Sequence, residues 1–265
     1  MLVDMHNRLI NVRKRHIKND DEVIQIVKAA AAAGITHMIA TPLHQKGQQG
    51  ANINSIQICV NQLNDKLKKL NIPITVLEGM EVSYYDELAN DIEFSVLPVG
   101  RSNKYVFISF PNDCIPPFAL KVFFEMQLLG YIPIIANAEL NEEIQKDPSK
   151  LYYFVNKGTL VHVGAGSVLG KYGRRIQKLA LKLCKDGQVH FIFSVSTIND
   201  SQQSHLKSAY NYLEKKLSID AVEYFMWNAE SLVKGIDFNV LSPINSNMKY
   251  SNLSRGRVFD FRRGR

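Results

Sequence analysis

The chain has 265 residues, of which 46% are apolar and 22% charged, and its formal net charge is +7. This length and balance are typical of a globular chain that forms one α/β barrel or two smaller domains. No apolar run approaches the roughly 20 residues that span a bilayer, and Asp4 in the first apolar run argues against a signal peptide. Three widely spaced cysteines favour neither a disulfide framework nor a zinc site, so we expect a reducing cytoplasm.

Seven apolar, β-branched runs follow one another along the chain and predict buried strands. Their hydrophobicity is continuous and does not alternate, which is the pattern of parallel strands covered on both faces. The runs are residues 2–7, 36–41, 74–82, 105–110, 132–137, 159–163 and 189–194.

The stretches between these runs carry helix signals. Residues 23–33 are rich in helix formers, and Gly34 supplies a stop signal after them. From Ile176 the apolar residues recur at the spacing of one helix face, and this helix is expected to end at Gly187. The same spacing recurs over residues 206–213.

Strands that alternate with helices predict a parallel sheet. No Gly-rich dinucleotide motif follows the first strand, so we favour a closed barrel over a doubly wound sheet. We therefore expect an α/β fold, a distorted (β/α)7 TIM-like barrel over residues 1–240. Residues 241–265 are expected to form a short, flexible basic tail. In such barrels the chemistry lies at the carboxyl ends of the strands.

The predicted strand ends carry a series of motifs, among them Val-Asp-Met-His at residues 3–6 and Gly-Met-Glu-Val at residues 79–82. With these motifs the chain resembles the PHP-family tyrosine phosphatases of the CpsB/YwqE type, which act in capsule and exopolysaccharide control. The resemblance runs from about residue 1 to residue 235. It rests on segments in the same order, at residues 3–6, 34–42, 76–82, 102–110, 128–139, 165–170 and 205–210.

The family resemblance implies a cluster of divalent metals that activate a water and neutralise the phosphate ester. Two of the implied metal ligands are retained, and these are His6 and Glu81. The other ligand positions are substituted, and they fall on Arg8, Leu43, Ser109, Asn137, Val195 and Thr197. Two implied arginines fall on Leu140 and Gln202. Leucine and valine offer no lone pair, and a guanidinium offers only donors.

These substitutions predict a catalytically inactive pseudophosphatase that has a regulatory or phospho-ligand-binding role and needs no cofactor. In this interpretation His6 and Glu81 are remnants of the metal site. The alternative is a residual metal-dependent phosphotyrosine phosphatase with Mn, Fe or Zn, in which His44 replaces Leu43 and Asp200 replaces Val195 as ligands. A third interpretation is a structural subunit whose outer helices form an oligomer interface.

Four basic residues lie at and after the end of the first strand: Arg8, Arg13, Lys14 and Arg15. Guanidinium groups bind phosphate in a bidentate manner, so Arg8, Arg13 and Arg15 are candidates to hold a phosphotyrosine or a phosphosugar without cleaving it. In the competing interpretation, residues 13–15 form an exposed basic loop. Arg8 then fills the former metal space and pairs with Glu81.

The last 24 residues carry six basic residues and one acidic residue, while the rest of the chain is close to neutral. We therefore expect no specific nucleic-acid binding by the fold. The tail suits contact with an anionic membrane, or it is a disordered solubilising end. The resemblance implies a membrane-associated bacterial tyrosine kinase or another phosphorylated protein as partner. We expect a cytoplasmic protein that associates with the membrane through such contacts.

Overall fold

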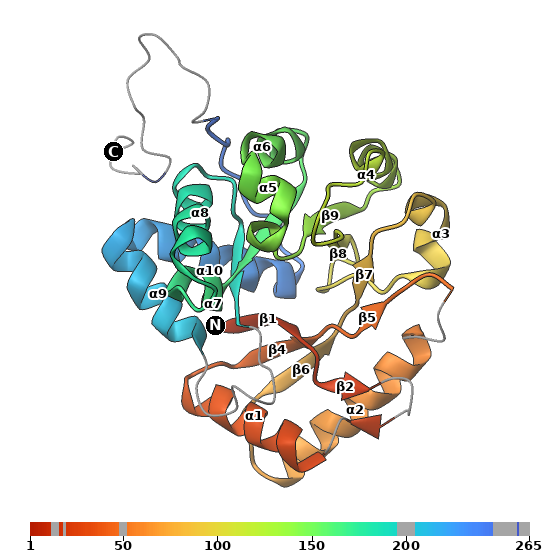
Figure 1. Cartoon of the computed structure of the whole chain (residues 1–265). Helices are drawn as coiled ribbons and strands as arrows, with labels where there is room; N and C mark the ends of the chain where they lie inside the picture. The colour runs from red at the N-terminus through yellow and green to blue at the C-terminus, as the bar shows by residue number, and fades with distance from the viewer. Residues whose placement is uncertain (12–15, 18–19, 48–51, 195–204, 246–258, 260–265) are drawn as a thin grey trace.

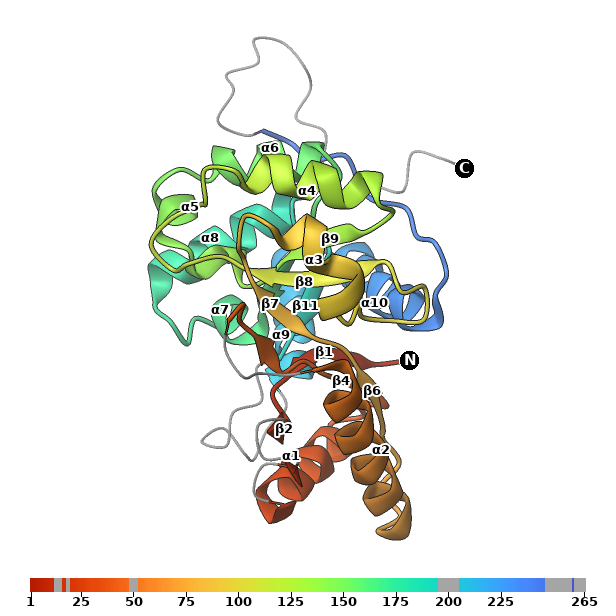
Figure 2. The same ribbon diagram turned by 90° about the vertical axis from the view of Figure 1, so that its right-hand side faces the viewer.

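The strands of this protein are held in two parallel sheets and one small hairpin (Figures 1 and 2). The structure, a computed structural model, describes residues 1–11, 16–17, 20–47, 52–194, 205–245 and 259. The first sheet has the order β1-β4-β6, with β1 (Val3–Asn7), β4 (His37–Ala40) and β6 (Thr75–Glu78). The hairpin pairs β2 (Ile10–Asn11) with β3 (His16–Ile17) in antiparallel fashion.

The second sheet has six strands in the order β11-β10-β9-β8-β7-β5, and every neighbouring pair is parallel. Its strands are β5 (Leu43–His44), β7 (Glu81–Ser83), β8 (Tyr105–Ser109), β9 (Ile132–Ile135), β10 (Leu160–Gly164) and β11 (Phe191–Phe193). All seven predicted runs form strands, and the α/β class is confirmed. Among the described residues the backbone pairing is divided between these sheets, and the closed seven-stranded barrel stays a prediction.

The third predicted run forms two strands, because the chain crosses from one sheet to the other at Gly79. Strand β6 pairs with β4, whereas β7 pairs with β5 and β8. A Cβ at Gly79 would lie 2.5 Å from Val99 Cγ1 and 2.9 Å from Ile39 Cγ2, closer than side chains tolerate. The close packing of Val99 and Ile39 against this crossing therefore requires glycine at this position.

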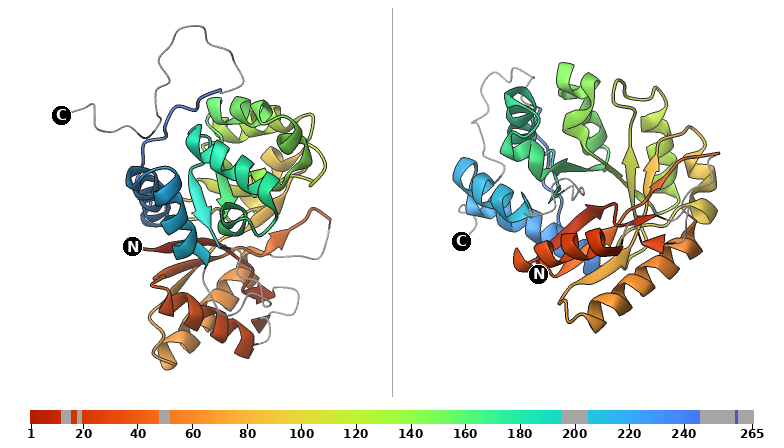
Figure 3. Two further views of the ribbon diagram at one scale, coloured as in Figure 1. Left: turned by 60° about the vertical axis from the view of Figure 1, so that its left-hand side comes forward. Right: turned by 60° about the horizontal axis from the view of Figure 1, so that its bottom comes forward.

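Helices surround the strands on the outside of the molecule (Figure 3). The predicted helices are present, since residues 23–33, 176–184 and 206–213 fall within α1, α8 and α9 apart from the terminal Ala33. The helices are α1 (Asp20–Ala32), α2 (Ile53–Lys69), α3 (Leu88–Ser95), α4 (Ala119–Leu128), η2 (Ala138–Leu140), α5 (Glu142–Lys146), α6 (Ser149–Asn156), α7 (Ala165–Leu169), α8 (Arg174–Lys185), α9 (His205–Lys216) and α10 (Ile219–Lys234). In the part of the chain that the structure describes, none of these helices has the length and hydropathy of a membrane span.

A buried carboxylate connects the first strand to the end of the last one. Asp4 of β1 is fully buried, and its Oδ1 accepts a hydrogen bond from the Ser194 amide at 3.0 Å. The Ser194 hydroxyl donates to Oδ2 of the same carboxylate. Burial raises the pKa of Asp4 to about 7, although the hydrogen bonds from Ser194 oppose the shift. This contact brings the two sheets together at β1 and β11.

Part of the predicted basic tail packs against the helices. The Ile244 amide donates to the carbonyl of Asp186 at 2.8 Å, and the ring of Phe259 packs against Tyr224 and Phe225 of α10. Phe259 is buried. The boundary at residue 240 and the flexibility of the tail stay predictions, because most of residues 246–265 lie outside the described part of the chain.

A buried histidine makes stability depend on pH. The Nδ1 atom of His190 accepts a hydrogen bond from the Val161 amide at 3.1 Å, and the ring is fully buried. Burial lowers the pKa of His190 to about 3. The unfolded chain takes up this proton near pH 6.5, whereas the folded chain does not, so the neutral ring stabilises the fold above pH 6.5. That contribution is lost as the pH falls from 6.5 towards 3.

We expect His190→Asn to flatten this pH dependence. Asparagine keeps an acceptor for the Val161 amide and does not titrate. Between pH 7 and pH 5 the variant should lose less free energy of unfolding than the native chain, by up to about 2 kcal/mol. Urea denaturation at both pH values measures the difference. The control is His205→Asn, at a histidine that is only half-buried. Equal losses in the native chain and in His190→Asn would contradict this account.

Candidate functional site

The candidate site begins at the carboxyl end of β1. All five residues of this strand are buried, and side chains two apart share a face, so Asp4 and His6 point the same way. The His6 ring contacts the rings of Phe107, His162 and Phe193, with centroids 5.9, 5.2 and 5.0 Å away. These partners belong to β8, β10 and β11. His6 therefore reaches into the interior between the two sheets.

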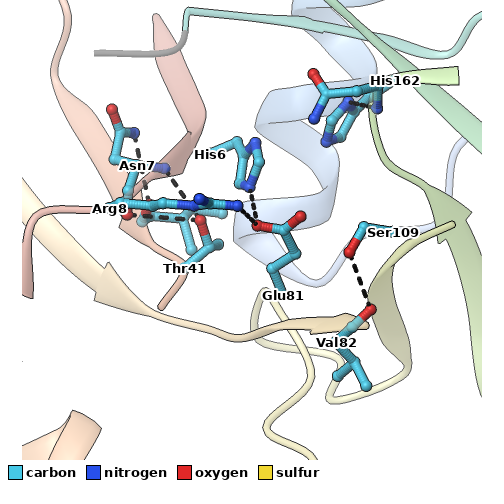
Figure 4. Close-up of polar contacts among 10 residues, drawn as sticks. His6, Asn7, Arg8, Thr41, Glu81, Val82, Ser109 and His162 are labelled. Carbon is cyan, nitrogen blue, oxygen red and sulfur yellow. Dashed lines mark hydrogen bonds and ion pairs between the residues drawn. The ribbon is translucent and has the colours of Figure 1, made fainter. Parts of the chain in front are cut away.

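One oxygen of the Glu81 carboxylate accepts hydrogen bonds from both basic side chains at the end of β1 (Figure 4). Oε2 of Glu81 accepts a hydrogen bond from His6 Nε2 at 2.9 Å and another from Arg8 Nη2 at 2.9 Å. Glu81 is 1% exposed, whereas the Arg8 side chain is 53% exposed. The predicted pairing of Arg8 with Glu81 is present, and the guanidinium also faces solvent.

The charge state of Glu81 follows from these contacts. Burial is the largest influence and by itself would raise the pKa of Glu81. The hydrogen bond from His6 and the charges of His6 and Arg8 together outweigh it and lower the pKa to about 2. Glu81 is therefore an ionised, buried carboxylate whose charge is matched by protein groups.

The end of β1 is held against β4 by backbone and side-chain hydrogen bonds. The Asn7 amide donates to Thr41 Oγ1 at 3.1 Å, and Asn7 Nδ2 donates to the carbonyl of Asp4 at 3.0 Å (Figure 4). The register between β1 and β4 shifts between Asp4 and Asn7. These bonds fix the backbone from which His6 and Arg8 project.

The substituted ligand positions that the structure describes take part in ordinary packing and hydrogen bonding. The Ser109 hydroxyl donates to the carbonyl of Val82 at 3.4 Å (Figure 4). The backbone amide of Asn137, a residue with φ of +52°, donates to His162 Nδ1 at 3.3 Å. Leu43 lies in β5 opposite Glu81. His44 follows it in β5 and is half-buried.

Several predicted site residues lie outside the described part of the chain. Their roles therefore stay predictions. They are Arg13, Lys14, Arg15, Val195, Thr197, Asp200 and Gln202.

Two buried polar groups near the site were not predicted as site residues. His162 is fully buried, its pKa is held well below the usual value by burial, and its Nε2 has no hydrogen-bond partner among the residues that the structure describes. Glu139 accepts hydrogen bonds from the Gly164 amide at 2.9 Å and from the Ser167 hydroxyl at 2.6 Å. Burial raises the pKa of Glu139. A carboxylate two residues after the predicted strand at residues 132–137 was the available signal for Glu139.

The described residues do not fit a centre of several divalent metals. Such a centre needs convergent carboxylate and imidazole ligands with free lone pairs. Oε2 of Glu81 already accepts two hydrogen bonds, and the Arg8 guanidinium beside it is a permanent cation that repels metal ions. Within the described ranges, no group of three or more His, Cys, Asp or Glu side chains is placed to hold a metal.

The parallel α/β fold carries a polar cluster where β1 ends and β7 begins. A family model described as capsular polysaccharide synthesis, CpsB/CapC, matches residues 2–234. The chain belongs to this CpsB/CapC family, which confirms the family predicted from its motifs.

Individual relatives agree with this assignment. The chain is 32% identical over 233 residues to tyrosine-protein phosphatase YwqE of Bacillus subtilis (strain 168), covering 88% of this chain and 92% of that protein. It is 30% identical over 231 residues to the putative tyrosine-protein phosphatase CapC of Staphylococcus aureus, and the match covers 86% of this chain and 90% of that protein.

A solved structure is similar over almost its whole length. It comes from work on YwqE from Bacillus subtilis and CpsB from Streptococcus pneumoniae, described as unique metal-dependent tyrosine phosphatases. The TM-score is 0.84 at 30% sequence identity, and the match covers 91% of this chain and 98% of the other. The backbone frame of the family is therefore retained in this chain.

The Arg8 contact predicts a measurable loss of stability. Replacing Arg8 by methionine removes one of the two side chains that donate hydrogen bonds to the buried Glu81 carboxylate. We expect Arg8→Met to lower the free energy of unfolding at pH 7 by about 1–3 kcal/mol, less than for a fully buried pair because Arg8 faces solvent. Urea denaturation at pH 7 and pH 3 measures the effect.

The sign of the pH effect follows from the lowered pKa of Glu81. Its stabilising contribution is present above pH 4.5 and is lost as the pH falls towards 2, so the stability difference between Arg8→Met and the native chain should be smaller at pH 3 than at pH 7. The control is Lys46→Met, which removes exposed, solvent-screened ion pairs with Glu87 and Asp91 and should cost less stability than Arg8→Met. Equal stability of Arg8→Met and the native chain at pH 7 would refute the argument.

Proposed function

We propose that this chain is a pseudophosphatase of the CpsB/CapC family, which binds a phosphorylated ligand at the end of β1 and does not hydrolyse it. The observation that supports this most directly is the Glu81 carboxylate, which His6 and Arg8 satisfy without a metal. Phosphate-ester hydrolysis by a metal-activated water needs a set of ligands that the described residues do not offer.

The Arg8 guanidinium supplies the proposed binding chemistry. It has five N–H donors, and the bond to Glu81 is made through Nη2 alone. The side chain is half-exposed, so its other donors are accessible to a phosphate oxygen. Arg13 and Arg15, which lie outside the described residues, add positive charge a few positions further along the chain.

The proposed ligand is a phosphotyrosine on a protein of the capsule or exopolysaccharide machinery. The family description and the tyrosine phosphatases among the relatives support this class of ligand. In this proposal the partner is a membrane-associated tyrosine kinase or another phosphorylated protein, and the chain works in the cytoplasm close to the membrane. The basic residues of the tail would favour an anionic membrane surface.

A residual metal-dependent phosphatase is the second candidate. The observation in its favour is the high structural similarity to proteins described as metal-dependent tyrosine phosphatases. This candidate requires His44 and Asp200 as ligands beside His6 and Glu81, together with Mn, Fe or Zn. The ion pair between Arg8 and Glu81 would have to break before that carboxylate could bind a metal.

Metal content and turnover separate the two candidates. After incubation with excess manganese and desalting, we expect elemental mass spectrometry to find well under one metal per chain. Hydrolysis of p-nitrophenyl phosphate should be no faster than in a chelator-treated sample. YwqE, prepared in the same way, is the positive control. Two or three metals per chain together with chelator-sensitive turnover would replace the pseudophosphatase by the second candidate.

Ligand binding tests the role of Arg8 separately. We expect a tyrosine-phosphorylated peptide to bind the native chain in calorimetry and the unphosphorylated peptide not to bind. Arg8→Met should weaken binding at least tenfold, because a bidentate charged hydrogen-bond pair is lost. Lys46→Met, which removes an exposed cation from a neighbouring loop, should leave the affinity unchanged. Unchanged affinity in Arg8→Met would exclude Arg8 as the anion-binding residue.

A further inference from the structure

Helix α4 exposes a stripe of large apolar side chains. Leu120, Phe124 and Leu128 are spaced four residues apart, so they lie along one side of the helix, and they are 44%, 59% and 72% exposed. The opposite side of α4 is buried in the core through Ala119, Val122, Phe123 and Met126. The helix is therefore apolar on both sides, although only one side packs against the core of this chain.

The neighbouring residues extend this apolar surface. Phe118 and Leu129, at the two ends of α4, are more than half exposed. Helix α3, which lies beside α4, carries Phe94 at 83% exposure (Figure 2). Scattered apolar residues are normal on protein surfaces, whereas a contiguous group on one helix indicates an interaction surface. Most of the energy of such a surface comes from burying aromatic and aliphatic side chains.

The charges on α4 indicate which partner fits. Lys121 and Glu125 run along one edge of the stripe, each one residue after a stripe residue, and their Nζ and Oε1 atoms are 3.7 Å apart. When two copies of α4 pack in antiparallel fashion about a two-fold axis, Lys121 of one copy faces Glu125 of the other. The same contact recurs on the other side of the axis, so the surface is complementary to itself.

The charges also disfavour an anionic membrane as the partner. Helix α3 carries Asp91 and Glu93 beside Phe94, and α4 carries Glu125 beside Phe124. Carboxylates around an apolar patch repel acidic lipid headgroups. Glu125 does not hinder a second copy, because Lys121 of that copy faces it with the opposite charge.

We propose that the chain forms a two-fold dimer through α4, with the stripe Leu120, Phe124 and Leu128 of one copy packed in antiparallel fashion on that of the other. The contact lies on α4, on the outside of the molecule (Figures 1 and 2), whereas His6, Arg8 and Glu81 belong to β1, the residue that follows it, and β7. The dimer is independent of the proposed function, since none of the three cluster residues contributes to it.

Sedimentation equilibrium of the full chain over a range of concentrations tests the proposal. We expect the native chain to be a dimer and Phe124→Glu to dissociate at least tenfold more readily. The matched control is Trp227→Glu on α10, because Trp227 is also an exposed large apolar residue, at 55%. Circular dichroism and thermal unfolding confirm that each variant is folded. A monomeric native chain, or a Phe124→Glu variant that stays as dimeric as the control, would overturn the proposal.

A charge exchange tests the antiparallel geometry and the identity of the partner. Lys121→Glu places two acidic residues opposite each other at both ends of the contact, and Glu125→Lys does the same with two basic residues. Each single variant should weaken the dimer, and the double variant should restore it, because the opposite charges face each other again. This packing would be contradicted if the double variant dimerised no more tightly than the single variant with the less stable dimer.

Discussion

The buried carboxylate of Glu81 is the constraint on which the site depends. A charged group removed from water must be matched by partners, and its burial otherwise favours the neutral form. Both partners come from the end of β1, as His6 and Arg8, while Glu81 belongs to β7 in the other sheet. The ion pair therefore connects the two sheets where β1 ends and β7 begins.

Strand β1 carries a second polar contact of the same kind on the same face. Asp4 holds the chain at the end of β11 through Ser194, as His6 holds β7 through Glu81. Apolar packing is not directional, so the core alone would allow several relative placements of the two sheets. Directional hydrogen bonds to buried carboxylates select one placement, because an unpaired carboxylate in the interior is costly. Hydrogen bonds between side chains and backbone of the protein itself therefore fix how the two sheets lie relative to each other.

The two proposals use different parts of the molecule and different physics. At the strand ends, the proposed binding of a phosphorylated ligand depends on charge, through the half-exposed guanidinium of Arg8. On α4, the proposed dimer depends on apolar burial and takes its orientation from Lys121 and Glu125. A dimer of this kind would present two binding sites at once, which raises the apparent affinity for a multiply phosphorylated partner.

The sequence by itself determined the α/β class, the seven strand runs, the family and the retention of His6 and Glu81, because these depend on local hydrophobicity and on motifs of a few residues. The tertiary structure decided which side chains meet. Arg8 and Glu81 are 73 positions apart, and Glu139 and Ser167 are 28 apart. It also decided that the third run divides at Gly79 and that the Leu120 side of α4 stays exposed. Periodicity identifies an apolar face, but it does not show whether the same chain covers it.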